Sequence, residues 1–533
     1  MGHAMYNSDR YPFFRLAIML GAVFMAACGD GDGGGLPSLV SNWVQGVFLP
    51  SGTFSSHCAS PRSGVDANGR PFPDVQGTTL DENNWLRSWS DELYLWYSEI
   101  TDRDPAGFQT LDYFDLLKTF ATTPSGTDKD QFHFTFPTDE WLALSQAGVS
   151  AGYGMNLSFI SSVPPRNVVL AYTDPGTPAT SAPANLARGA MLLAIDGIDL
   201  VNDNTSAGID ILNAGLFPAA AGETHSFTVL DFGAANNRTF NMQSANITST
   251  PVQNVSTIST ITGEIGYMLF NDHIATAEQG LIDAINQLQA ANIDDLVIDL
   301  RYNGGGFLDI ASELAFMIAG PAQTAGQTFE RIVFNDKHPV TNPVTGQPLT
   351  PIPFHTTSQG FSTPSGQALP TLNLSRVFLL TGPNTCSASE SVISSLQGVD
   401  VEVIQIGSTT CGKPFGFFPD DNCGTTYFSI QFQGLNAKDF GDFTDGFSPA
   451  NSTGTTGVLV TGCSVADDFS AALGDSTEGR LAAALNFRDT QSCPMPSGTT
   501  QKLALSGPET FSLDAVDGLV PKSPWLENKI IVH

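Results

Sequence analysis

Two residues whose types could perform nucleophilic chemistry are Ser387, within the segment Asn384 to Glu390, and Lys413, within Cys411-Gly412-Lys413. A serine hydroxyl is a poor nucleophile at neutral pH and needs a base within hydrogen-bonding distance. Lysine can be that base once it is sufficiently desolvated to lose its proton, and serine/lysine pairs are an alternative to the serine/histidine triad. The two residue types therefore predict attack by Ser387 with Lys413 as its base.

A third stretch, Asn303-Gly304-Gly305-Gly306, could supply the hydrogen-bond donors that such an attack requires. Consecutive glycines allow backbone N–H groups to face a ligand without obstruction by side chains. We expect the N–H groups of Gly305 and Ala388 to form an oxyanion hole.

Each of the three stretches follows a short apolar run that we expect to be a strand. These runs are 296–300, 377–380 and 401–406. Apolar residues at helical spacing follow the glycines and Ser387, which predicts two strand-to-helix turns. Such a turn places the Ser387 hydroxyl at a helix N-terminus. In a parallel sheet, the ends of the strands that precede Ser387 and Lys413 would be adjacent.

Taken alone, each stretch also has a simpler interpretation. Serine at this position commonly caps a helix, lysine is usually solvated, and a glycine run usually marks a turn. The three stretches together, in this order, favour the chemical interpretation.

The ordered motifs resemble the C-terminal processing (tail-specific) protease family. They are Asp299-Leu300-Arg301-x-Asn303-x-Gly305-Gly306, Ser387-Ala388-Ser389-Glu390 and Gly412-Lys413. The resemblance implies a serine peptidase in which Ser387 is the nucleophile and Lys413 the base. One position departs from the pattern: relatives often carry an orienting glutamine four residues after the lysine, where this chain has Phe417. Three residues remain alternatives for orienting Lys413: Glu390, Gln431 and Gln433.

The 533 residues predict a multidomain α+β protein, because the chain is too long for one typical core. Residues 46–147 carry an aromatic stripe at helical spacing and are expected to form an N-terminal helical domain. Residues 148–245 resemble a PDZ-like β-rich domain whose turn Tyr153-Gly154-Met155 would bind a peptide carboxylate; a spacer that binds nothing is the alternative. Residues 250–493 are expected to form an α/β (crotonase-like) serine peptidase core, and 494–533 remain unassigned.

The N-terminus predicts export. Arg10, Arg15 and the apolar run 16–27 indicate a signal peptide over residues 1–27. Met25-Ala26-Ala27-Cys28 resembles a lipoprotein processing box, which would make Cys28 the lipidated residue, followed by a flexible glycine-rich tether over 28–45. These features predict a bacterial cell-envelope lipoprotein facing the periplasm, at the outer membrane; a plain secreted protein is the alternative.

The amino-acid composition limits the classes of partner and cofactor that this protein is expected to bind. The net charge of −31 argues against nucleic acid and against an anionic membrane surface, so that the only membrane contact expected is the lipid anchor. Without Cys-x-x-Cys or His-Glu-x-x-His, neither a metal nor another cofactor is expected. The six cysteines after Cys28 predict disulfides. We favour a Cys411–Cys423 bond, with Cys386–Cys411 as the alternative.

Two functions remain open. The first is a serine endopeptidase acting on proteins or peptides that present free C-termini. The second is a catalytically inactive protein on the same fold that binds peptides or an apolar ligand. The intact Ser387 and Lys413 favour the first function, and Phe417 favours the second.

Overall fold

A computed structural model describes residues 43–66, 69–147, 149–494 and 529–530. The expected signal peptide 1–27, Cys28 and most of the tether lie outside these residues, as does most of 494–533. The described residues from Gln45 onward form one compact unit. No helix within the described residues combines the length and the apolar character that crossing a membrane requires.

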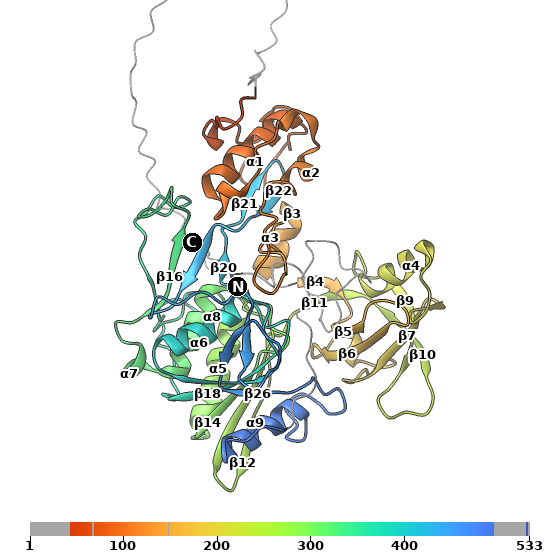
Figure 1. Cartoon of the computed structure of the whole chain (residues 1–533). Helices are drawn as coiled ribbons and strands as arrows, with labels where there is room; N and C mark the ends of the chain where they lie inside the picture. The colour runs from red at the N-terminus through yellow and green to blue at the C-terminus, as the bar shows by residue number, and fades with distance from the viewer. Residues whose placement is uncertain (1–42, 67–68, 148, 495–528, 531–533) are drawn as a thin grey trace, which may run out of the picture. The chain divides into compact units, whose positions relative to one another are not determined.

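A mainly parallel sheet forms the centre of the C-terminal part (Figure 1). Its strands, in spatial order, are β12 (Val252–Thr260), β13 (Gly263–Phe270), β14 (Asp295–Asp299), β18 (Arg376–Thr381), β19 (Glu402–Gly407) and β26 (Gly462–Ser464). Only β12 runs antiparallel to its neighbour. The strands expected at 296–300, 377–380 and 401–406 are therefore present as β14, β18 and β19.

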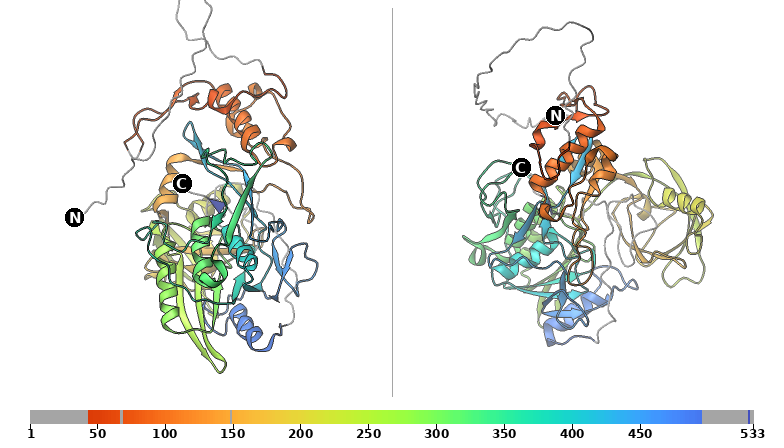
Figure 2. Two further views of the ribbon diagram at one scale, coloured as in Figure 1. Left: turned by 90° about the vertical axis from the view of Figure 1, so that its left-hand side faces the viewer. Right: turned by 45° about the horizontal axis from the view of Figure 1, so that its top comes forward.

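Helices cover both faces of this sheet (Figures 1 and 2). Alternate strand residues such as Leu296 and Ile298 pack with α5 (Ala277–Ala290), α6 (Leu308–Ala319) and α8 (Ala388–Gly398). Val297, between them, faces the opposite way and packs with α9 (Gly479–Thr490). Because successive side chains of a strand point to opposite faces, a strand buried on both sides reads as a continuous apolar run.

A smaller sheet lies beside the central one. Its order is β17 (Ile352–Pro353), β16 (Thr328–Phe334), β23 (Phe432–Leu435) and β20 (Phe415–Gly416). The short helix α7 (Pro321–Thr324) precedes β16. Strand β20 begins two residues after Lys413 and therefore connects this sheet to the predicted base.

The region expected to be PDZ-like has its own hydrophobic core. Its sheet contains, in spatial order, β10 (Arg238–Gln243), β9 (Thr224–Leu230), β7 (Met191–Ile195), β6 (Asn167–Thr173) and β5 (Met155–Ser161), with β8 (Ile198–Asp199) paired to β7 and one helix, α4 (Ser206–Leu216). The antiparallel pair β4 (Val149–Gly152) and β11 (Ala245–Thr248) joins the two ends of the region. Strand β5 is an edge strand of the five-strand path.

The N-terminal region contains the helices α1 (Thr79–Leu93), α2 (Thr110–Phe114) and α3 (Thr138–Ala147), but it does not pack alone. Strand β3 (Phe134–Pro137) pairs with β22 (Thr425–Phe428), which forms a hairpin with β21 (Asp420–Asn422). Figure 1 shows this hairpin beside α1. Trp85 of α1 stacks on Trp89 and lies 5.3 Å, between ring centroids, from Tyr427 of the hairpin. Residues far apart in the sequence therefore complete this core.

Three disulfides join described residues, and the expected Cys411–Cys423 bond is wrong. The bonds are Cys58–Cys423, Cys386–Cys411 and Cys463–Cys493. Cys423 lies at the turn of the β21–β22 hairpin, which extends to the N-terminal region, so it bonds to Cys58 of that region. Cys411 instead meets Cys386, the alternative pairing.

Candidate active site

The three predicted site loops leave the same edge of the central sheet. Strands β14, β18 and β19 are neighbours and parallel, with Asp299 opposite Leu380 and Thr381 opposite Gly407. Their carboxyl ends therefore bring together the glycine run, Ser387 and Lys413, as in other open α/β sheets whose sites lie beyond the strand ends.

Hydrogen bonds fasten these loops to one another. The carbonyl oxygen of Asn303 accepts the Cys386 N–H at 3.1 Å and the Ser389 hydroxyl at 3.1 Å. The carbonyl oxygen of Thr385 accepts the Cys411 N–H at 3.0 Å. The loop that carries Ser387 is therefore bonded to the glycine loop on one side and to the lysine loop on the other.

Ser387 occupies a strained turn directly before α8. Its backbone has φ 57° and ψ −112°, a conformation that is costly for a residue with a Cβ. The side chain is fully buried and approaches the Glu390 N–H in a capping-box arrangement. Among the described residues, however, its hydroxyl has no hydrogen-bond partner. Buried hydroxyls are normally paired, so an unpaired one in a strained turn indicates a functional position.

Glu390 connects Ser387 to the lysine loop. Its carboxylate accepts the N–H groups of Ser387 at 3.0 Å, Gly412 at 2.8 Å and Lys413 at 2.7 Å. The Thr410 hydroxyl donates a fourth bond at 2.5 Å. Oε2 accepts the backbone N–H groups of both Ser387 and Lys413. The two backbone nitrogens can therefore lie no farther apart than the sum of these two N···O distances. Burial raises the pKa of Glu390, and these donors oppose the shift.

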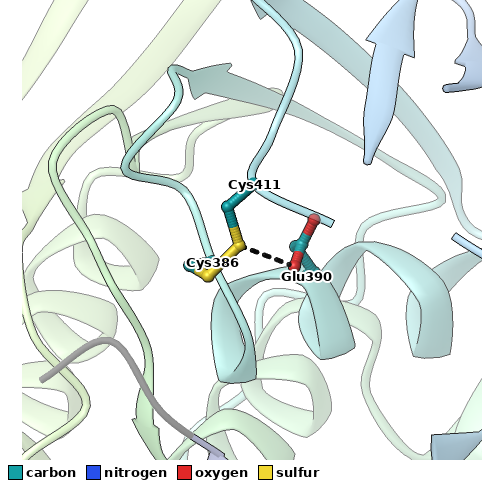
Figure 3. Close-up of side chains that lie close together, drawn as sticks. All are labelled: Cys386, Glu390 and Cys411. Carbon is teal, nitrogen blue, oxygen red and sulfur yellow. Dashed lines mark hydrogen bonds between the residues drawn. A yellow bond between two sulfur atoms is a disulfide. The ribbon is translucent and has the colours of Figure 1, made fainter. Parts of the chain in front are cut away.

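The Cys386–Cys411 disulfide covalently joins the same two loops (Figure 3). Its sulfur atoms and the Glu390 carboxylate lie within 4.8 Å of one another. Cys411 Sγ is 3.4 Å from Glu390 Oε2, a van der Waals contact because a disulfide sulfur carries no hydrogen to donate. Since both sulfurs are bonded to each other, this group lacks the thiolates that would hold a metal ion.

The Lys413 side chain is fully buried among aromatic rings. Its Nζ lies 4.3 Å from the ring centroid of Phe132 and 4.9 Å from that of Phe417. Phe417 thus contacts the amine from the position where relatives often carry glutamine. Of the three alternatives for orienting Lys413, Glu390 accepts its backbone N–H, while Gln431 bonds to the backbone of Phe418 and Gln433 to that of Gly441.

The predicted oxyanion donors differ in their surroundings. Ala388 is the first residue of α8, where N–H groups have no partner inside the helix. The Gly305 N–H donates to the Asn303 side-chain oxygen at 3.0 Å and would have to leave it to bind an oxyanion. Gly306 has φ 130°, and a Cβ there would lie 2.3 Å from the carbonyl oxygen of His273.

His273 is a site residue that sequence reasoning missed. Its Nδ1 lies 3.0 Å from Asn303 Oδ1, which also accepts the Gly305 N–H, and its backbone bonds to Gly305 and Phe307. Asn303 Oδ1 can only accept, so Nδ1 carries the proton. The available signal was the polar sequence Asn271-Asp272-His273 directly after β13, at the same sheet edge.

The turn expected to bind a carboxylate precedes edge strand β5. Gly154 has φ 74°, and the carbonyl oxygens of Tyr153 and Gly154 accept the N–H groups of Ala179 and Asp174. Met155 is the first residue of β5. Cys28, the expected lipidation site, lies outside the described residues.

The class of protein is given by a family model: residues 264–417 match peptidase family S41, a range that includes the glycine run, Ser387 and Lys413. The chain is also 30% identical over 215 residues to a carboxyl-terminal-processing protease of Picosynechococcus sp.. That alignment covers 39% of this chain and 48% of the relative, so the chain spans about half the length of this curated relative. The chain therefore carries an S41 peptidase domain homologous to carboxyl-terminal-processing proteases, and the resemblance seen in the motifs is confirmed.

The fold is similar to that of one solved structure. A structure described as an S41 protease of Bacteroides fragilis has a TM-score of 0.57 and 20% identity, covering 79% of this chain and 98% of its own. The photosystem II D1 C-terminal processing protease has a TM-score of 0.41 and 18% identity, covering 70% and 92%. The mixed α/β multidomain fold resembles that of S41 proteases.

Proposed function

We propose that this protein is an exported serine endopeptidase of the tail-specific type, in which Ser387 attacks the peptide carbonyl and Lys413 takes its proton. The observation that carries the proposal is the Glu390 carboxylate, one oxygen of which accepts the N–H groups of both residues. The disulfide between the same loops and the unpaired, buried Ser387 hydroxyl support it.

Each step of acyl transfer has a candidate group in this chain. Ser387 Oγ bonds to the carbonyl carbon as its proton passes to Lys413 Nζ, and that proton then goes to the leaving amine. The Ala388 N–H, and the Gly305 N–H once it leaves Asn303, would stabilise the oxyanion by about 3 kcal/mol each. Water then releases the acyl group, with Lys413 again as base.

We propose proteins and peptides with free C-termini as the substrates. The edge strand β5 and the turn Tyr153-Gly154-Met155 support a PDZ-like mode of capture, in which the peptide adds a strand and the turn binds its carboxylate. The Arg188 guanidinium bonds to Asp467 at 2.7 Å and to the Tyr302 hydroxyl at 2.7 Å, which connects this region to the core. The crotonase-like assignment of the core is part of the same proposal.

The location is proposed from the sequence. The apolar run 16–27 and Cys28 support a lipoprotein of the bacterial cell envelope that faces the periplasm. The three disulfides support an oxidising compartment. Globomycin, which blocks lipoprotein signal peptidase, would cause the precursor to accumulate in cells; processing that is the same with and without globomycin would contradict the anchor.

One observation favours the alternative, a catalytically inactive binding protein. Phe417, rather than a hydrogen-bonding glutamine, lies 4.9 Å from Lys413 Nζ. An aromatic ring cannot orient the amine lone pair as an amide would.

The experiment that separates the two functions uses Ser387→Ala, with Ser395→Ala as the matched control. Ser395 is buried in the same helix and its hydroxyl bonds to the Phe329 carbonyl oxygen at 2.9 Å, away from the site loops. Both variants and the wild type are incubated with an unfolded protein and with peptides of differing C-termini, and fragments are followed by mass spectrometry. We expect cleavage by the wild type and Ser395→Ala only; three inactive proteins that still bind the peptides would favour the binding function.

A further inference from the structure

A segment near the end of the sequence lies at the proposed active site. Strand β27 (Lys529–Ile530) pairs in parallel with β15 (Gly306–Phe307), with Lys529 opposite Gly306 and Ile530 opposite Phe307. Gly306 belongs to the glycine run, and its other neighbour is His273. The segment is therefore bonded directly beside the predicted oxyanion loop.

The same segment also lies beside β20, which begins two residues after Lys413. Strand β27 is thus hydrogen-bonded to the continuation of the glycine loop and lies close to the strand that continues the lysine loop. The Ser387 loop is bonded to both of these loops, through Asn303 and through Glu390. A chain in this position crosses the junction of the three site loops.

This is the geometry by which an extended peptide binds a protein through strand addition. Ile530 is β-branched, a type of residue that favours extended backbone. A segment of the same chain also competes at a high effective concentration, which a dilute external peptide cannot match.

We infer that the gap between β15 and β20 is the peptide-binding channel of the site, and that the chain's own Lys529–Ile530 segment occupies it as an intramolecular, substrate-like competitor. The channel takes extended peptide backbone as its ligand. The competition with substrate rests on the proposed function, whereas the occupancy of the channel does not.

The test keeps the full chain and weakens only the strand. Successive N–H groups of a strand point to opposite sides, so Lys529→Pro with Ile530→Pro removes whichever N–H bonds to β15. The matched control is Lys529→Arg with Ile530→Val, which keeps every N–H and the side-chain character. We expect the proline variant to cleave external peptides with kcat/KM at least about tenfold above the wild type, because the binding-competent fraction rises. The control should match the wild type.

A second readout needs no catalysis. A fluorescent peptide of residues 526–533 is titrated into the proline and control variants, each also carrying Ser387→Ala, and anisotropy is recorded. Tight binding to the proline variant and weak binding to the control would support the inference, even if no variant cleaves and the peptidase proposal fails. Equal binding to both variants, or equal cleavage rates in active enzymes, would overturn it.

Discussion

Two buried groups of charges in this molecule are built differently. The guanidinium of Arg301, fully buried just after β14, makes two bonds to Glu478 and one each to Asp299 and Asp467, all at 2.7–2.8 Å. At the candidate site, Glu390 instead accepts backbone N–H groups and a hydroxyl, while Lys413 Nζ lies against two aromatic rings. In the first group, cations and carboxylates meet as side chains.

The charges around Arg301 are paired and stabilise the fold, whereas the proposed function requires the charge of Lys413 to change. Burial would raise the pKa of Asp467, but Arg301, Arg480 and Arg188 lower it well below its ordinary value. In such a network each buried charge is paired with an opposite charge, and no proton has to be transferred. The Glu390 carboxylate positions the backbone of Lys413 through N–H groups, and two aromatic rings lie against the amine.

Removing the amine at the candidate site should give the largest effect. We expect Lys413→Met to lower kcat by about 10⁴-fold or more, as is found for residues that act with the nucleophile as one unit. Lys413→Arg should be as damaging, because a guanidinium stays protonated. The control is Lys438→Met, which removes an exposed lysine that pairs with Asp400. Steady-state cleavage of a fluorogenic peptide measures all three, and activity retained in Lys413→Arg would contradict the base assignment.

The wild-type pH profile tests the same residue. Lys413 must be neutral to take a proton, so kcat should rise with pH until the amine is fully deprotonated and then level off. A flat profile from mildly acidic to alkaline pH would mean that another group is the base.

A substitution in the buried charge network around Arg301 should lower the free energy of unfolding. Glu478→Gln keeps the shape but leaves the buried Arg301 guanidinium without its bidentate partner, so we expect a loss of about 3–5 kcal/mol in the free energy of unfolding. Asp400→Asn, which breaks an exposed pair with Lys438, should cost less than about 1 kcal/mol. Urea unfolding measures both, and equal losses would show that burial does not distinguish the two kinds of pair.

The three strands that carry the candidate site could be predicted from the sequence. The apolar runs before Gly304, Ser387 and Lys413 became β14, β18 and β19, because burial on both faces favours apolar residues along most of each strand. Parallel pairing then brought the three strand ends together. What could not be predicted depends on contacts between loops that local sequence does not encode.

The role of Glu390 shows why. Its place in the motif indicates the N3 residue of a capping box. No residue near it in the sequence indicates that the N–H groups of Gly412 and Lys413 will also donate to its carboxylate. The pairing of Cys411 was missed for the same reason: proximity in sequence favoured Cys423, whereas the β21–β22 hairpin takes Cys423 to Cys58. The boundaries drawn at 46–147 and 250–493 could not anticipate that this hairpin would complete the N-terminal core.

Two disulfides close loops of similar length, so the effect of a disulfide's position on activity can be tested separately from its effect on stability. Cys386–Cys411 and Cys463–Cys493 have sequence separations of 25 and 30, so removal of either, as a double serine variant, should cost about 3 kcal/mol of stability. Only loss of the first releases the Ser387 loop from the Lys413 loop, and we expect kcat to fall at least about tenfold in that variant alone. Thermal unfolding and peptide cleavage are measured on both; equal kcat values would show that Glu390 suffices to align the loops.

A third buried carboxylate group refines the comparison, because it keeps a proton. Glu278 accepts backbone N–H groups of the loop 359–363, as Glu390 does in the site, and Glu313 lies beside it. Burial, with the nearby charge of Glu278, raises the pKa of Glu313 to about 9. Above its ordinary value of 4.5 the unfolded chain loses this proton while the folded chain keeps it, so the free energy of unfolding falls as pH rises from about 4.5 to about 9.

Glu313→Gln should remove that dependence, because an amide donates a hydrogen bond at every pH. Between pH 6 and 9, we expect the wild-type Tm to fall by several degrees more than that of Glu313→Gln, while Glu402→Gln, at an exposed position, should follow the wild type. Calorimetry across this range provides the measurement. Parallel curves for all three would mean that Glu313 is already ionised beside Glu278, and that buried backbone N–H groups can hold two carboxylates in this fold as readily as they hold one at Glu390.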